Sequence, residues 1–316
     1  MHRILWALLF LVANGWAQSY PNKPIRMIVP LVPGGNQDIV ARAVAEELSK
    51  SLGQQVIVEN RPGQSAIIGT QFVKSSAADG YTLLSVAVTF ARVPAVVKAA
   101  GYDAATDFTG VSLVCRIPQV LVVNPKSGIA DLAALLAKLR AEPGRHHFAS
   151  AGIGSAVHVA GEVFRAVSGT DIQPVHYRGG GPAMQAVITG DAIFVVDPIP
   201  SALGIIRGGA VRPLAIAGPQ RVGSLAEVRT SAEAGLPDFR HEAWLVALAP
   251  ARTPPAAIAA LQEAFAAAQQ QAAPRLAELS VQAVPEVATP AQVMEFLQAE
   301  MRRGVALLRA AGVQPE

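Results

Sequence analysis

The residues best suited to chemistry lie where short apolar runs end in glycines and a helical pattern begins. The first such junction is V-P-G-G-N-Q-D, Val32 to Asp38. Gly34 and Gly35 can adopt backbone angles that other residues avoid, so several N–H groups can converge on one ligand. The positive end of the following helix would add to this effect, which predicts an anion site. From spacing alone, a tight turn that binds nothing is the alternative.

The second junction is A-S-A-G-I-G-S-A-V-H, Ala149 to His158. Ser155 suits the N-cap position of a helix. The G-x-S-x-G spacing of a hydrolase nucleophile is absent, because Gly154 directly precedes Ser155 and Ala156 follows it. No partner spacing supports a catalytic triad, so we expect His158 to be a packing residue rather than a general base.

Two further junctions carry charged residues. In H-Y-R-G-G-G-P-A, Arg178 precedes three glycines and a proline that suits the first turn of a helix. Arg178 could clamp a carboxylate with paired donors, or it could be an ordinary surface arginine. In V-V-D-P-I-P-S-A, Asp197 ends an apolar run and is expected to cap the next helix. Asp38, in the first junction, is expected to stabilise its helix or to pair with Arg42 at i+4.

No pattern in the chain is typical of a catalyst. Paired carboxylates, Ser/His/Asp spacing and Cys/His sets are missing, and the adjacent His146 and His147 cannot share one helix face as metal ligands. Four loop-to-helix junctions without a catalyst favour binding over turnover. We therefore expect no enzyme activity, no cofactor and no metal site.

Composition excludes other classes of protein. The 316 residues are 51% apolar and 16% charged, with a net charge of +3 and a mean hydropathy of +0.35, the reverse of a disordered chain. No stretch clusters Lys and Arg, which argues against a nucleic-acid partner. The single cysteine, Cys115, excludes an internal disulfide and is expected to be packed rather than reactive.

The first 17 residues predict a secretory signal peptide. Arg3 supplies the charge, Ile4 to Ala13 an apolar stretch, and Gly15-Trp16-Ala17 a cleavage site. Ten apolar residues are too few to span a membrane, which takes about 20. We expect cleavage near Ala17 and a soluble, periplasmic mature protein; a buried first helix is the alternative.

The rest of the chain alternates β-rich and helical runs, which predicts α/β architecture with parallel strands covered by helices. The expected strands are 25–30, 56–58, 81–86, 111–114, 120–123, 172–176, 193–196, 214–217, 243–249 and 281–284. The expected helices are 36–52, 66–76, 132–140, 156–167, 182–188, 199–206, 255–271, 273–279 and 290–311.

The length suggests two domains, and no flexible linker separates them. We expect the chain to cross between two lobes through ordered strands at Pro118–Asn124 and Trp244–Pro250. Lobe 1 then comprises residues 18–119 and 245–316, and lobe 2 comprises 120–244. This arrangement predicts a hinge and a cleft bounded by both lobes.

Ordered blocks along the mature chain resemble the Bug receptors, the solute-binding proteins of tripartite tricarboxylate transporters. They are I-V-P-L-V-P-G-G-N-Q-D, V-E-N-R-P-G, A-D-G-Y-T-L-L, D-F-T-G-V-S-L-V, the A-G-x-G-S-x-x-H set around Ser155, Y-R-G-G-G-P-A, D-P-I-P-S-A-L and S-A-E-A-G-L-P-D-F. Leu31 and Val32 replace the commoner Phe-Pro of that family, which weakens the transfer of any particular ligand.

The resemblance implies a two-lobed periplasmic binding protein fold, type II-like, that closes over a small organic carboxylate. Such ligands include di- and tricarboxylates, acidic amino acids and aromatic acids. It implies a monomer that delivers its ligand to membrane permease subunits. The implied ligand contacts are Gly34, Gly35, Asn36, Gln37, Ser85 and Thr89 in lobe 1, and Ser150, Gly152, Ser155, Tyr177, Arg178, Gly179 and Asp197 in lobe 2.

Two alternatives remain at this stage. One is a receptor that signals to a sensor kinase and transports nothing. The other is an exported hydrolase that uses Ser155 or His158.

Overall fold

The structure is a computed structural model that describes residues 20–64, 66–97, 100–284, 286 and 288–310. The predicted signal peptide, residues 1–17, lies outside the described residues. Among the described helices, none combines the length and apolar character needed to cross a membrane.

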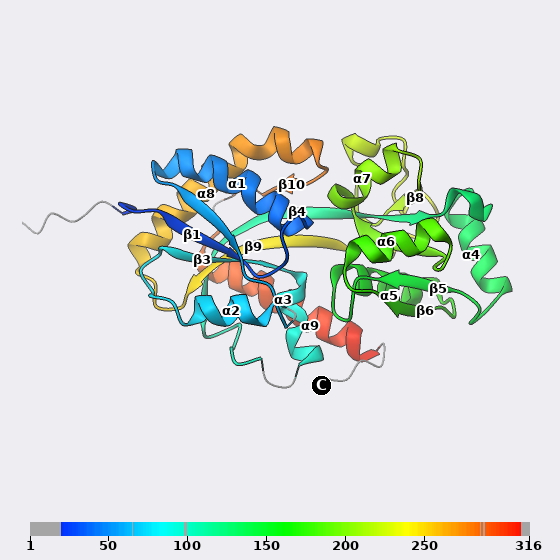
Figure 1. Ribbon diagram of the computed structural model, residues 1–316, viewed down its shortest axis with the longest axis horizontal. Helices are drawn as coiled ribbons and strands as arrows, with labels where there is room; N and C mark the ends of the chain where they lie inside the picture. The colour runs from blue at the N-terminus through cyan, green and yellow to red at the C-terminus, as the bar shows by residue number, and fades with distance from the viewer. Residues whose placement is uncertain (1–19, 65, 98–99, 285, 287, 311–316) are drawn as a thin grey trace, which may run out of the picture.

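Two α/β lobes lie side by side and share one continuous sheet path (Figure 1). The strands are β1 (Ile25–Val29), β2 (Val56–Asn60), β3 (Thr82–Ala87), β4 (Phe108–Val123), β5 (His147–Ser150), β6 (Gln173–His176), β7 (Phe194–Pro198), β8 (Arg212–Ile216), β9 (Glu242–Pro250) and β10 (Gln282–Ala283). The helices are α1 (Asn36–Leu52), α2 (Ile67–Lys74), α3 (Val88–Val96), α4 (Leu132–Ala141), α5 (Ala156–Ser168), α6 (Gly180–Thr189), α7 (Ile199–Arg207), α8 (Pro255–Glu278) and α9 (Pro290–Ala310). Two short 3₁₀ turns, η1 (Pro125–Ser127) and η2 (Gly223–Leu225), complete the described elements.

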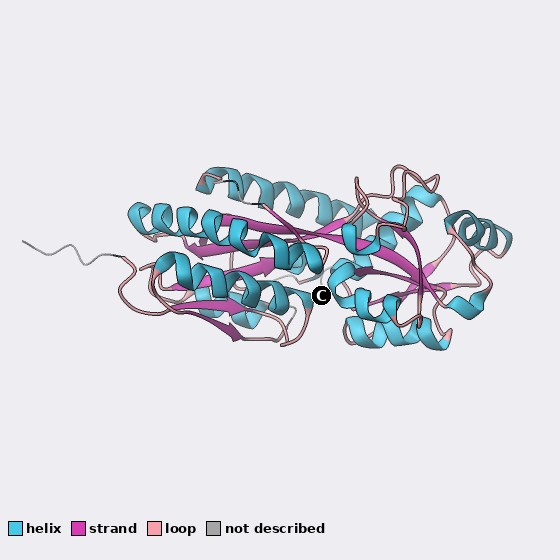
Figure 2. Cartoon of the chain, turned by 90° about the horizontal axis from the view of Figure 1, so that it is seen from above, coloured by secondary structure: helices cyan, strands magenta, loops and turns pink. Residues whose placement is uncertain are grey.

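The strand order is β2-β1-β3-β9-β4-β7-β5-β6, with β10 and β8 also pairing with β4. In the first lobe β1 runs parallel to β2 and β3, and in the second lobe β5 runs parallel to β6 and β7. Helices cover both faces of the sheet (Figure 2). Helices that follow parallel strands therefore begin at the same edge in each lobe, which brings their N-termini together.

Strand β4 is the main connection between the lobes. Its first half pairs with β9, from Phe108 opposite Pro250 to Pro118 opposite Glu242. Its last five residues, from Gln119, pair instead with β7 in the second lobe. The chain thus passes between lobes at residues 117–119, where the segment expected to cross, Pro118–Asn124, begins.

Three apolar cores support this arrangement. One lies in the first lobe and contains residues of β1, β3, β9, α1 and α8. The other two lie on opposite faces of the second-lobe sheet, built from segments between residues 120 and 239. Leu308, near the end of α9, belongs to a second-lobe core, whereas Val293 and Leu297 belong to the first. Helix α9 therefore spans both lobes.

Several expected elements differ in extent. The strands expected at 111–114 and 120–123 form the single β4, because pairing with β9 and then β7 continues through Pro118. The helices expected at 255–271 and 273–279 form the single α8, with Pro274 inside it. Helix α3 lies in a segment where the sequence predicted neither a helix nor a strand. The return crossing precedes Trp244–Pro250, which lies within β9 in the first lobe.

Candidate functional site

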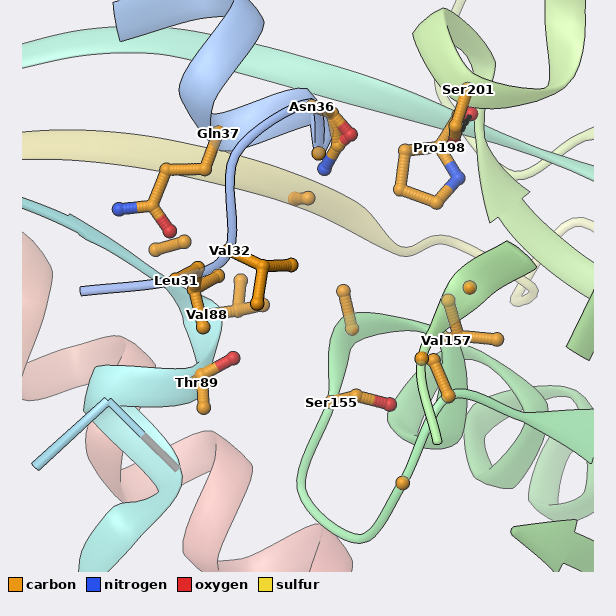
Figure 3. Close-up of a pocket in the computed structure, with 18 of the residues that line it drawn as sticks. Leu31, Val32, Asn36, Gln37, Val88, Thr89, Ser155, Val157, Pro198 and Ser201 are labelled. Carbon is orange, nitrogen blue, oxygen red and sulfur yellow. Dashed lines mark hydrogen bonds between the residues drawn. The ribbon is translucent and has the colours of Figure 1, made fainter. Parts of the chain in front are cut away.

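A cleft of about 1420 Å³ lies between the two lobes. Residues at the starts of α1 and α3 line it from the first lobe, and residues at the starts of α5, α6 and α7 line it from the second. Trp244 and Leu245 of β9, with Ile117 of β4, form part of its wall where the chain passes between lobes. Figure 3 shows side chains from both lobes directed into the gap.

In the first lobe the glycine junction leads into α1. Gly34 has a φ of 79°, in the left-handed region that favours glycine, and Gly35 is the N-cap. No side chain caps α1, so its first-turn N–H groups lack side-chain acceptors. Asn36 Oδ1 is buried without a hydrogen-bond partner among the described residues, and the Asn36 side chain points into the gap in Figure 3. These groups leave hydrogen-bonding capacity for a ligand.

Asp38 holds this junction in shape. Its carboxylate accepts hydrogen bonds from Gly34 N–H (2.9 Å), Arg42 Nε (3.0 Å) and Asn60 Nδ2 (3.0 Å). Burial opposes ionisation, but these three hydrogen bonds outweigh it and hold the pKa of Asp38 below its usual range. The predicted pairing with Arg42 is confirmed. The Gly34 N–H group is occupied by Asp38 and is not free for a ligand.

The neighbouring first-lobe residues divide into lining and supporting groups. Thr89, at the start of α3, lines the cleft, and its hydroxyl points toward the second lobe in Figure 3. Gln37 also lines the cleft, and its Nε2 donates to the Ser85 carbonyl at 2.6 Å. Ser85 itself is buried behind the surface. It supports Gln37 rather than lining the cleft.

The second-lobe junction is closed by internal hydrogen bonds. Ser155 caps α5, since its Oγ accepts from the His158 N–H at 3.1 Å. Gly152 N–H donates to Ser150 Oγ (3.2 Å), and Gly154 N–H donates to His158 Nδ1 (3.1 Å). The N–H groups of Gly152, Gly154 and His158 are therefore occupied, and the remaining donors of this junction are Ser155 O–H and the other first-turn N–H groups of α5.

His158 is a supporting residue, as the sequence predicted. Its ring is 1% exposed, with Nδ1 on Gly154 N–H and Nε2 3.6 Å from Glu162. His176 packs edge-on against this ring and contacts Ser150 Oγ at 2.9 Å. Both ring nitrogens of His158 thus face groups other than Ser155 Oγ, so these two residues do not form a nucleophile–base pair.

The third junction brings a cation and three glycines to the cleft. Arg178 lines it and is exposed, followed by Gly179, Gly180 and Gly181 at the start of α6. No side chain caps α6, so the Gly180 and Gly181 N–H groups lack side-chain acceptors. Tyr177 is half-buried against a second-lobe core and does not line the cleft.

The fourth junction places an acid in the cleft wall. Asp197 ends β7 and is 3% exposed, and its Oδ2 accepts from Ser201 Oγ at 2.5 Å. Burial raises the pKa of Asp197 to about 7, with the Ser201 hydrogen bond acting in the opposite direction. Asp197 and Arg178 are the charged side chains among the lining residues.

Ten of the thirteen predicted contacts line the cleft, whereas Ser85, Ser150 and Tyr177 lie behind it. That any of these thirteen residues contacts a ligand remains a prediction. The cleft is also lined by residues that were not predicted as contacts from the sequence, among them Val88, Gly180, Gly181 and Ser201. The signal for Ser201 was its position four residues after Asp197, which places both on one side of a helix start. In the described ranges, no group of three His, Cys, Asp or Glu side chains could hold a metal ion.

A two-lobed α/β chain with helix N-termini facing a central cleft defines a solute-binding protein. Residues 40–313 match the model of the tripartite tricarboxylate transporter family receptor. The chain belongs to this family.

Individual relatives agree with this family assignment. The chain is 38% identical to protein BugT of Bordetella pertussis over 304 residues, covering 94% of this chain and 92% of BugT. It resembles R. palustris Rpa4515 with adipate (TM-score 0.85, 29% identity, 94% and 100% of the two chains). It also resembles MatC of Rhodopseudomonas palustris with bound malate (TM-score 0.80, 30% identity, 92% and 100%). The predicted two-lobed fold and the resemblance to the Bug receptors are confirmed.

Proposed function

We propose that this protein is a periplasmic receptor that binds a small organic carboxylate between its lobes and delivers it to the membrane subunits of a tripartite tricarboxylate transporter. The observation that carries the proposal is the set of helix N-termini, from both lobes, around one cleft that holds a single basic side chain. Partial positive charge and free N–H groups at helix starts favour an anion.

Each lobe supplies half of the site. The starts of α1 and α3 belong to the first lobe, and the starts of α5, α6 and α7 belong to the second. A carboxylate ligand that bridges the halves favours closure, because only the closed form engages both sets of donors. Bending is expected where β4 changes partner, at residues 117–119.

Relatives support the ligand class. The structures of Rpa4515 with adipate and of MatC with bound malate align with 94% and 92% of this chain. Both ligands are small carboxylates, and both proteins share the fold in which the cleft lies. Hydrogen bonds at Ser155 and His158 serve loop structure, which supports binding without turnover. Residues 1–17 support export to the periplasm, and a monomer suits a receptor that closes.

The test is a thermal-shift screen of residues 18–316 against mono-, di- and tricarboxylates and acidic amino acids. A ligand at 100 times its dissociation constant stabilises the fold by about 2.7 kcal/mol, which raises the melting midpoint by a few degrees. Stabilisation by one chemical class of acid would support the proposal. No shift with any acid, in protein shown to lack co-purified ligand, would contradict it.

A further inference from the structure

Each lobe has one buried acid at a junction that leads into a helix, and the surroundings of the two acids differ. Asp38 in the first turn of α1 receives hydrogen bonds from a backbone N–H, an arginine and an asparagine. Asp197, just before α7, has one side-chain hydrogen-bond partner in the described part of the chain, the Ser201 hydroxyl. Pro198 and Pro200 lack N–H groups, so the start of α7 offers fewer backbone donors than other helix starts. Asp197 is therefore a buried carboxyl with little to stabilise its charge.

The contacts of Ser201 leave room for a proton on Asp197. Ser201 Oγ lies 2.5 Å from Asp197 Oδ2 and 2.8 Å from the Pro198 carbonyl oxygen. A hydroxyl has one hydrogen and cannot fully serve both acceptors. If that hydrogen goes to the Pro198 carbonyl, a protonated Asp197 supplies the hydrogen for the shorter contact. Figure 3 shows Ser201 and Pro198 together on the second-lobe wall of the cleft.

The other oxygen of Asp197 faces the ligand donors. A Cβ on Gly180 would lie 3.7 Å from Asp197 Oδ1, so this oxygen lies beside the start of α6. A ligand carboxylate held by the Gly180 and Gly181 N–H groups would approach Asp197. Two carboxylates this close, one of them buried, cannot both remain ionised without a large cost.

The charged groups around Asp197 offer no alternative counter-ion. Arg178 lines the cleft, but no ion pair joins it to Asp197 among the described residues. The titratable side chains on elements packed near Asp197 are His147 of β5, His158, Glu162 and Arg165 of α5, His176 of β6, Arg116 of β4 and Arg207 of α7. Glu162 pairs with Arg165 at 2.6 Å, and burial lowers the pKa of His176, which disfavours its cationic form.

We propose that the cleft takes up one proton, held on Asp197, together with its carboxylate ligand. The inference rests on the proposed function and narrows the ligand class to acids without an ammonium group. An amino acid would instead favour ionised Asp197 as a counter-ion and would release a proton on binding. The burial that raises the pKa of Asp197 to about 7 places this exchange within the physiological range.

The experiment is calorimetric titration with adipate, malate, benzoate and glutamate from pH 6.5 to 8.5, in two buffers of different ionisation enthalpy. The carboxyl groups of all four acids are ionised in this range, so protonation of the ligand carboxylates does not contribute. We expect the acid that binds to take up nearly one proton at pH 8. Its dissociation constant should rise about tenfold per pH unit above the pKa of Asp197.

Two variants make the test specific. Asp197→Asn should bind the same acid with a dissociation constant that no longer changes with pH, because its amide stays neutral. Asp191→Asn makes the same chemical change on an exposed residue of the second lobe outside the cleft, and it should keep the wild-type pH dependence. Unfolding curves at pH 8 check that Asp197→Asn is folded.

The outcomes separate the two proposals. Binding of an acid with no proton uptake, or tightest binding of glutamate with proton release, would overturn this inference and leave the receptor function intact. A pH dependence that survives in Asp197→Asn would assign the proton to another group and would also overturn it. Failure of every acid to bind at every pH would overturn both.

Discussion

At the residue scale, small side chains at helix starts keep the ligand donors accessible. Gly180 and Gly181 have ordinary helical backbone angles, so an alanine fits the backbone at either position. A Cβ on Gly181 would meet nothing within 4 Å, and one on Gly180 would meet only Asp197 Oδ1 at 3.7 Å. The free protein therefore has room for a methyl group where the ligand is expected.

Gly180→Ala and Gly181→Ala should weaken carboxylate binding without harming the fold. The added methyl would cover the N–H donors, which we expect to cost about tenfold in affinity, equivalent to ~1.4 kcal/mol. Alanine is the better helix former, so the melting midpoint should stay equal or rise. Calorimetric titration and thermal unfolding measure the two effects. Gly204→Ala in α7, where a Cβ also meets nothing within 4 Å, is the matched control and should leave affinity unchanged.

Asp38→Ala should destabilise the first-lobe junction. It removes the acceptor for Gly34 N–H, Asn60 and Arg42 and leaves partly buried donors unpaired, which we expect to cost about 1–3 kcal/mol of unfolding free energy. The lowered pKa means that this stabilisation is present above the usual carboxyl pKa and is lost as the pH falls through the lowered value. The free energies of unfolding of variant and wild type, measured in urea, should therefore differ at pH 7 and should differ less near pH 3. Glu227→Ala, an exposed acid, should change stability by under about 0.5 kcal/mol.

At the element scale, the sequence predicts well where helices begin, but it predicts poorly how far a single strand or helix continues. Glycines and prolines mark the beginnings of α1, α6 and α8, so these junctions and the charged groups beside them could be found without coordinates. Helix α3 was missed because its Val-rich run, with Pro94, shows no helical period. Strand β4 continues through Pro118 because its partners on successive segments hold it extended, which is a long-range effect. The burial of Ser85 and Ser150 behind the cleft surface also depends on long-range packing, so it could not be predicted from the sequence.

Close packing of α5 on β5 supports the second-lobe junction. A Cβ on Gly161 would overlap the ring of Phe148 in the fully buried core. Gly161→Ala should therefore force α5 away from the strand and cost about 1–3 kcal/mol of unfolding free energy. Chemical denaturation measures the loss. Adding Phe148→Leu should recover part of it in the double variant; equal loss in single and double variants would contradict the packing argument.

At the scale of the whole molecule, three connections couple the lobes. Strand β4 contributes to both halves of the sheet, and α9 begins on the first core and ends on a second-lobe core. Arg92 of α3, 3% exposed, lies 3.4 Å from the Ser155 carbonyl oxygen and 3.4 Å from His241 Nε2. Burial lowers the pKa of Arg92 to about 10, so it stays a cation at neutral pH. The lobes are thus linked beside the cleft and behind it, and a ligand should stabilise the molecule as one unit.

Cys115 reports on this coupling. It lies in β4 opposite Leu245 of β9, is fully buried, and is the single cysteine of the chain. Burial raises the pKa of its thiol to about 12, opposed by a hydrogen bond from the Leu245 backbone, so a thiol reagent should react only after the β4–β9 pair opens. If opening requires global unfolding, ligand at 100 times its dissociation constant should slow labelling about 100-fold, because it depletes the unfolded population by that factor. Rates with and without ligand, measured by mass spectrometry and compared with the rate in denaturant, test this. A labelling rate that bound ligand does not change would show that β4 and β9 separate while the cleft stays intact. The shared strand β4 would then be a local hinge rather than the common core of both lobes.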